Sequence, residues 1–189
     1  MEYRKQSFSV EDAGIEGLKV INPFFIEDER GFFLKNFEKD IFSGLGLENE
    51  IHEEFLSRSV KNVVRGLHFQ TAEPQIKIVG AVEGRVFDVA VDLRRDSKTY
   101  GKYESCELSG ENHKLFYIPR GFAHGFLVLS DFAIVSYMCI GRYRPEHDTG
   151  ILWSDPDIGI KWPVDYKDVI ASKRDAGLMR FKEYDKING

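Results

Sequence analysis

The chain has 189 residues, of which 42% are hydrophobic and 30% are charged, a composition typical of a folded globular domain. Its net charge of −5 argues against a general nucleic-acid binder, and its two cysteines are too few for a disulfide framework. No stretch approaches the roughly 20 apolar residues of a membrane span, and the N-terminal segment lacks an apolar signal core. We therefore expect one domain over residues 1–189, a cytoplasmic location, and no membrane or nucleic-acid partner.

The first third of the chain has two strand-like segments with a helix-like segment between them. Residues 15–26 and 51–60 have the pattern of strands. Between them, residues 35–46 carry spaced apolar side chains followed by two glycines. This pattern predicts a short helix that ends at the glycines.

From residue 75 onward the pattern is that of short β-strands. Between Phe87 and Leu93, apolar residues alternate with Asp88, Ala90 and Asp92, which predicts a strand with one apolar and one partly acidic face. Gly84 is expected in the hairpin turn before this strand, and further strands are expected at residues 113–118, 124–129 and 133–140. Short strands at this spacing predict a sandwich or barrel.

The end of the chain departs from this pattern. After Pro163 the sequence becomes more polar, which predicts turns or a short helix packed on the outside. The expected fold class is therefore all-β: a barrel with its core at about residues 50–145, short peripheral helices and a C-terminal extension.

Two histidines lie in runs that have the form of cupin half-motifs. Residues 119–126 place His124 after a Pro/Gly turn, and residues 65–70 contain His68. A metal-binding cupin would have a second histidine where this chain has Gln70, so one ligand is missing. We therefore expect a cupin-like β-barrel or jelly roll that carries out acid/base chemistry without a metal or other cofactor. Metal binding through His124 is the minority interpretation.

His68 is the candidate base. An isolated histidine is more often structural, but polar side chains are unusually dense around this one. An imidazole can accept a carbon-bound proton when a carboxylate orients its other nitrogen. Asp88, Asp92 and Asp175 are the candidate orienting groups, and the residue pattern does not choose among them.

Three further side chains have a chemical interpretation, and two of them, Lys77 and Tyr137, also have a structural one. Lys77 is either a solvated lysine on an edge strand or, beside Arg65, part of a site for phosphate or a developing enolate. Tyr137 is either a core tyrosine or a proton donor opposite a base. Tyr143 is a candidate for stacking on a ligand ring.

Taken together, the motifs resemble those of the dTDP-4-dehydrorhamnose 3,5-epimerase family. The matching runs follow the family's order from about residue 15 to residue 185. They are Asp28–Gly31 with Phe33, Ser57–Ser59, Arg65–Gln70, Gln75–Lys77, Gly84–Arg94, Ser97 with Thr99–Gly101, Ile118–Phe126, Tyr137, Tyr143, Trp153 with Asp155–Pro156, Ile160 with Trp162–Pro163, and Ser172–Asp175.

The resemblance implies a cupin-like barrel, a homodimer, and no metal or redox cofactor. The implied reaction is epimerisation at C3 and C5 of a nucleotide-diphospho-4-keto-6-deoxysugar, beside its C4 ketone. By resemblance His68 is the base, Asp175 orients it, Lys77 stabilises the enolate oxygen and Tyr137 is the acid. The residues that the resemblance assigns to substrate binding are Arg30 (from this or a neighbouring subunit), Phe33, Arg65, Gln75, His124, Tyr143, Asp148 and Arg174.

Several positions depart from the family pattern. Lys35 replaces a glutamate, and Glu53, Glu54 and Phe55 replace a Gln-Asp-Asn run that contributes to nucleotide recognition in the family. These departures leave open a relative that epimerises C3 or C5 alone, a ketoisomerase, or an enzyme for a GDP-linked sugar. A metal-dependent cupin oxygenase or isomerase and a non-catalytic sugar-nucleotide-binding barrel are the remaining alternatives.

Overall fold

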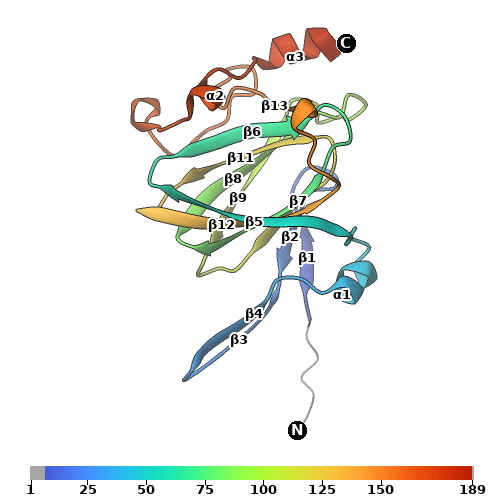
Figure 1. The fold of residues 1–189 in the computed structure, drawn as a ribbon, viewed down its shortest axis with the longest axis vertical. Coiled ribbons are helices and arrows are strands. Elements are labelled where there is room, and N and C mark those ends of the chain that lie inside the picture. The colour runs from blue at the N-terminus through green and yellow to red at the C-terminus, as the bar shows by residue number, and fades with distance from the viewer. Residues whose placement is uncertain (1–6, 189) are drawn as a thin grey trace.

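Two antiparallel β-sheets lie face to face and form the body of the molecule (Figure 1). The computed structural model describes residues 7–188. The larger sheet has six strands in the order β1 (Ser9–Asp12), β2 (Lys19–Asn22), β10 (Leu115–Ile118), β7 (Ile76–Glu83), β12 (Phe132–Ile140) and β5 (Ile51–Val60). The smaller sheet has five strands in the order β13 (Asp148–Gly150), β6 (Val64–Gln70), β11 (Phe122–Val128), β8 (Arg85–Asp92) and β9 (Tyr103–Ser109). This arrangement confirms the predicted all-β fold.

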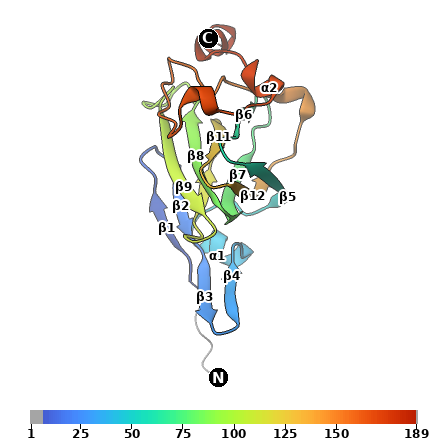
Figure 2. The same ribbon diagram turned by 90° about the vertical axis from the view of Figure 1, so that its left-hand side faces the viewer.

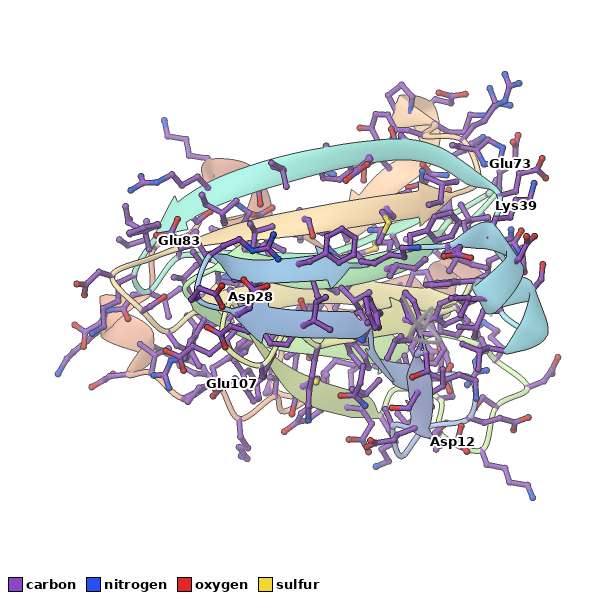
Figure 3. All side chains as sticks on the ribbon, turned by 90° about the horizontal axis from the view of Figure 1, so that it is seen from below. Asp12, Asp28, Lys39, Glu73, Glu83 and Glu107 are labelled. Atoms are coloured by element: carbon purple, nitrogen blue, oxygen red, sulfur yellow. The ribbon has the colours of Figure 1, made fainter. Side chains whose placement is uncertain are left out.

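The main core lies between the two sheets. Val79 and Val135 of the larger sheet pack in one cluster with Ala90 and Phe126 of the smaller sheet. All four side chains are buried, so the inner faces of both sheets are removed from water. Charged side chains such as Glu83 lie around the outside of the sheets (Figure 3).

Strand β8 is buried on both of its faces. Its even-numbered residues face the space between the sheets, as Ala90 does, while Val89 and Val91 pack in a second cluster with Ile160 and Trp162 of the C-terminal segment. The predicted alternation is therefore confirmed. The C-terminal extension packs on the outside of the barrel, as predicted, and covers the apolar face there.

The N-terminal region differs from the single strand predicted over residues 15–26. Strand β2 ends before Pro23, which has no N–H group to continue a ladder. The chain then enters a separate hairpin of β3 (Phe24–Asp28) and β4 (Gly31–Lys35), which projects from the barrel (Figures 1 and 2). The projecting hairpin was not predicted from the sequence.

The helices are short and peripheral. The predicted helix within residues 35–46 is α1, and the expected strand at residues 51–60 is β5. Gly84 lies between β7 and β8 with a φ of +74°, as expected for a tight turn. Within residues 7–188, no helix is both long and apolar enough to cross a membrane. The helical segments are α1 (Lys39–Gly44), η1 (Pro145–His147), η2 (Tyr166–Asp168), α2 (Lys173–Ala176) and α3 (Phe181–Asn188).

Candidate active site

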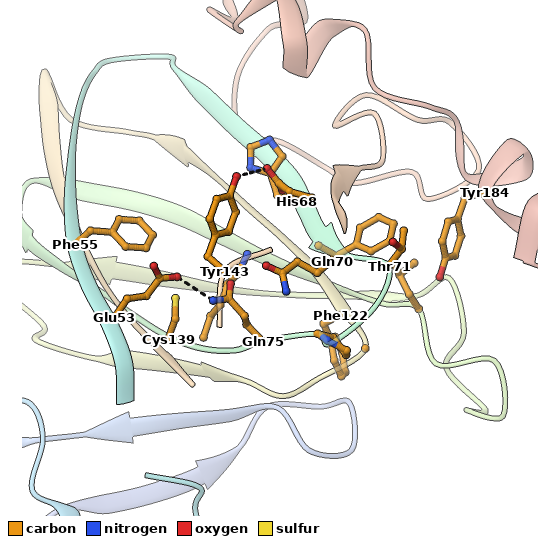
Figure 4. A pocket seen from close by; sticks show the side chains of 16 residues that line it. Glu53, Phe55, His68, Gln70, Thr71, Gln75, Phe122, Cys139, Tyr143 and Tyr184 are labelled. Atoms are coloured by element: carbon orange, nitrogen blue, oxygen red, sulfur yellow. Dashed lines mark hydrogen bonds between the residues drawn. The ribbon is translucent and has the colours of Figure 1, made fainter. Parts of the chain in front are cut away.

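A cavity of about 460 Å³ is formed by strands of both sheets, the loops that follow them and helix α3. Phe55 of β5 lies at one end and Tyr184 of α3 at the other, with His68 between them (Figure 4). Five of the residues predicted for the site line this cavity, namely His68, Gln75, Lys77, Tyr143 and Asp148. The structure thus collects residues from segments that are far apart in the sequence.

His68 and Asp175 form a hydrogen-bonded pair at the cavity wall. Nε2 of His68 donates to Oδ1 of Asp175 over 2.7 Å, which leaves Nδ1 as the basic nitrogen of the ring. Asp175 is buried in α2, where the Ser172 hydroxyl caps the helix by accepting from the Asp175 N–H. Burial alone would raise the pKa of Asp175, but the contacts with His68 and Ser172 outweigh it and lower the pKa. The aspartate therefore stays ionised beside the imidazole.

The other two candidate aspartates have different partners. Both carboxylate oxygens of Asp88 accept from Nε2 of His124, over 2.9 and 3.0 Å, deep between the sheets. Asp92 is fully buried and accepts hydrogen bonds from Arg94 and from loop hydroxyls. Of the three carboxylates, only Asp175 contacts His68 among the hydrogen bonds of the described residues.

Gly66 allows the strands that carry the two histidines to approach each other. His68 of β6 is paired directly with His124 of β11. Gly66 has a φ of +115°, and a Cβ atom there would lie 2.6 Å from the carbonyl oxygen of His124. A side chain at this position would force β6 and β11 apart. The Arg-Gly-Leu-His run therefore serves the geometry of the site as well as its chemistry.

Lys77 lies on β7 and its side chain lines the cavity. It is paired across the ladder with Cys139 of β12, which also lines the cavity. Burial lowers the pKa of Lys77, and the nearby carboxylates of Asp148 and Asp88 oppose this effect. When the amine carries its charge, that charge lies in a poorly solvated place and interacts strongly with a developing negative charge.

Tyr137 lies on β12, in the sheet that faces the one carrying His68. Its side chain is only 8% exposed and its ring stacks on that of Phe55, which lines the cavity. The edge of the ring meets His124 at a centroid distance of 5.9 Å. Burial raises the pKa of Tyr137 far above its ordinary value, so the phenol remains protonated and able to donate.

The predicted binding residues at the cavity form two hydrogen-bonded groups. Asp148 accepts from the Tyr143 hydroxyl over 3.0 Å and from Nη2 of Arg174 over 2.8 Å. Gln75 donates from its amide to a Glu53 carboxylate oxygen over 2.8 Å. The exposed ring of Tyr143 belongs to the first group, and the exposed ring of Phe55 lines the same cavity as the second. Hydrogen-bonding side chains together with exposed aromatic rings suit a polar ligand with a flat ring.

Five predicted binding residues are not among those that line the cavity: His124 and Arg174, whose partners are described above, and Arg30, Phe33 and Arg65. The Nε of Arg65 donates to the Ser59 hydroxyl, and Arg65 does not join Lys77 in lining the cavity. Arg30 is hydrogen-bonded to Asp28 of its own hairpin, and Phe33 is exposed on the same hairpin. Because the hairpin projects from the barrel, it does not bring these two residues to the cavity of the same chain (Figure 2). Their roles stay predictions.

Several cavity residues were not assigned to the site from the sequence. Glu53 and Phe55 were noted only as departures from a family pattern, although they alternate along a predicted strand and share a face. Cys139 shares its strand face with Tyr137, but the position of this face depends on pairing with β7. Tyr184 has no local signal because it reaches the cavity only through the docking of α3.

Gln70 braces two loops of the cavity. Its amide nitrogen donates to the carbonyls of Glu73 and Arg142, and its amide oxygen accepts from the Arg144 N–H. These contacts use both ends of the amide where a metal-binding cupin would have a histidine. Within residues 7–188, no group of three or more His, Cys, Asp or Glu side chains is arranged to hold a metal ion.

The fold and the site together define a cupin-like jelly roll with a histidine–aspartate pair at its cavity. Residues 12–183 match the dTDP-4-dehydrorhamnose 3,5-epimerase family over nearly the whole chain. The chain belongs to this family, and the resemblance seen in the sequence is confirmed.

Individual relatives agree with the family match. A dTDP-4-dehydrorhamnose 3,5-epimerase of Methanothermobacter thermautotrophicus is 48% identical over 170 residues, which cover 89% of this chain and 92% of the relative. The crystal structure of an epimerase of Legionella pneumophila in complex with dTDP-4-keto-L-rhamnose is 41% identical. It superposes with a TM-score of 0.90 over 93% of this chain and 94% of the other. A dTDP-4-dehydrorhamnose 3-epimerase of Streptomyces niveus is 39% identical, over 88% of this chain and 86% of that protein.

Proposed function

We propose that this protein is an isomerase that epimerises C3 and C5 of a nucleotide-linked 4-keto-6-deoxyhexose, converting dTDP-4-keto-6-deoxyglucose to dTDP-4-keto-rhamnose. The observation that carries the proposal is the 2.7 Å hydrogen bond between His68 and Asp175 at the cavity wall. Lys77 lines the same cavity and Tyr137 lies on the facing sheet. The family match and the named relatives support this substrate class.

In this mechanism the C4 ketone acidifies the neighbouring C–H bonds. Nδ1 of His68 takes the proton, and the electrons of the C–H bond move toward the C4 oxygen to form an enolate. Asp175 stabilises the imidazolium, and the Lys77 ammonium stabilises the enolate oxygen. Tyr137 then gives its proton to the carbon from the opposite face, and the ketone re-forms. No redox step and no metal enters this sequence.

Base and acid come from different sheets, which supports inversion at carbon. His68 is on β6 of the smaller sheet and Tyr137 is on β12 of the larger sheet. A sugar held between the sheets is therefore approached by the base from one side and by the acid from the other. The predicted binding residues that line the cavity, Tyr143, Asp148 and Gln75, are available to bind the nucleotide and the sugar.

A second candidate function is epimerisation at a single carbon. It is favoured by one observation, the 39% identity to a 3-epimerase. Both functions start with the same deprotonation, so the arrangement of His68, Asp175 and Lys77 serves either one. The number of carbons that exchange hydrogen separates them.

The broader expectations for the chain stay predictions. We infer one domain over residues 1–189, supported by the continuous family match from residue 12 to residue 183. A homodimer is expected from the family resemblance, and a cytoplasmic location is expected from the composition and cysteine content of the chain. Light scattering of the purified protein measures the oligomeric state directly.

The test is to incubate the purified, chelator-treated protein with dTDP-4-keto-6-deoxyglucose in deuterated water and to follow C3 and C5 by NMR. Deuterium at both carbons with inverted product is expected, and His68→Ala should abolish the exchange. Incorporation at one carbon would select the single-site alternative. A GDP-linked 4-keto sugar is tested in parallel, and no exchange with either sugar would contradict the proposal.

A further inference from the structure

Phe55 covers one face of the Tyr137 ring. The two residues are directly opposite each other in the antiparallel pair of β5 and β12, so their side chains lie on the same face of the sheet. Their ring centroids are 4.6 Å apart and their planes differ by 15°, which is a stacked arrangement. Phe55 is 45% exposed and lines the cavity, whereas Tyr137 is 8% exposed. Phe55 therefore lies between the tyrosine ring and solvent.

A second contact holds the edge of the same tyrosine ring. The ring of His124 meets Tyr137 edge-on, with an interplanar angle of 75°. His124 is itself fixed by two hydrogen-bond contacts to the buried carboxylate of Asp88. The tyrosine ring is thus held by a rigid, buried neighbour on one side and by Phe55 on the other. Of these two neighbours, Phe55 is the one on an edge strand.

The position of Phe55 is unusual for a residue that serves packing alone. It is on β5, the outermost strand of the six-stranded sheet, so no further strand of this sheet covers it. A ring that remains nearly half exposed gains little from burial, but the stack still limits rotation of the ring beneath it. The stack with Phe55 therefore restricts the orientation of the Tyr137 ring, while it adds little to the stability of the sheet.

We propose that Phe55 is a positioning residue for proton transfer by Tyr137: its stacked ring fixes the orientation of the tyrosine and keeps water away from it. This inference rests on the proposed role of Tyr137 as the acid. Without the stack, the hydroxyl spends less time aimed at the enolate carbon. The enolate then more often recovers a hydrogen from His68 on the original face. Where His68 has first exchanged its proton with solvent, this return yields exchange without inversion.

The experiment compares wild type with Phe55→Ala in deuterated water and measures, in the same NMR samples, total deuterium incorporation and inverted product. Stacking is worth about 0.5–1.5 kcal/mol, so the ratio of product to exchange should fall roughly 2- to 12-fold. Phe55→Tyr keeps a stacking ring and should restore the ratio. Leu56→Ala is the matched control, since Leu56 is the next residue, is 62% exposed and points to the other face of the strand.

An unchanged ratio of product to exchange in Phe55→Ala would overturn the inference, whether exchange and product are both retained or both lost to the same extent. Failure of the proposed function is distinguished by wild type, which would then show no exchange at all. A readout independent of turnover is nitration by tetranitromethane, followed by peptide mass analysis. Tyr137 should be protected in wild type and nitrated several-fold faster in Phe55→Ala, while Tyr143, 50% exposed, reacts in both. Equal protection of Tyr137 in both proteins would show that Phe55 does not shield it.

Discussion

Buried acidic residues of this protein have different tasks because each contacts a different partner. Asp175 contacts His68 and belongs to the proposed base, Asp88 holds His124, and Asp92 joins Arg94 to a loop. We expect Asp175→Asn to lower kcat by about 10²–10⁴ with little change in KM, because the neutral amide no longer stabilises the imidazolium. Steady-state kinetics measures both constants. Full activity of this variant would remove Asp175 from the mechanism.

The charge state of Lys77 should limit the activity at alkaline pH. The ammonium form is the one that stabilises an enolate, and burial lowers the pKa of Lys77 below its ordinary value. Activity should therefore be lost as the pH rises through this lowered pKa, sooner than for an exposed lysine. In Lys77→Arg the guanidinium stays charged, so the alkaline fall should move to higher pH. A pH profile of kcat measures this, and the same alkaline limb in both proteins would assign it to another group.

The four-residue helix α2 connects the secondary structure to the site. It carries Asp175, and the Ser172 hydroxyl caps it by accepting from the Asp175 N–H over 3.0 Å. We expect Ser172→Ala to cost about 1 kcal/mol of unfolding free energy. It should also lower kcat, because the carboxylate that orients His68 is then held less firmly. Ser172→Thr keeps the cap and is the control; urea unfolding and kinetics are the measurements, and a loss of stability with unchanged kcat would separate the cap from the site.

We expect the free energy of unfolding of the whole molecule to fall at acid pH because Asp92 becomes protonated. Burial alone would raise the pKa of Asp92, but hydrogen bonds from Arg94, Ser97 and Thr99 outweigh it and hold the pKa at about 2. Because this value is below that of an unfolded aspartate, the contribution is complete above about pH 4 and is lost as the pH falls toward 2. Relative to Asp92→Asn, wild type should lose about 2 kcal/mol of stability across this range. Urea unfolding at several pH values measures the difference, and a constant difference would contradict the assignment.

Much of the fold and of the site could be predicted locally. The alternation from Phe87 to Leu93, the turn at Gly84 and the short helix before β5 follow from side-chain periodicity and backbone freedom, which act within a few residues. The projecting β3–β4 hairpin was missed because the break at Pro23 lies inside an otherwise apolar run. Local pattern does not reveal which apolar run continues a sheet and which leaves it.

By itself, the sequence determined the all-β class, the candidate residues His68, Lys77 and Tyr137, and the family, because motif order and spacing are properties of the chain. The residue pattern left three aspartates open and the family resemblance implied Asp175. Only the tertiary structure shows the contact itself, since Asp175 is 107 positions from His68 and reaches it through α2. Strand register likewise decided that Phe55 covers Tyr137, since pairing of β5 with β12 sets which side chains face each other. Contacts between distant segments depend on how the sheets pair and pack, and no local pattern encodes that geometry.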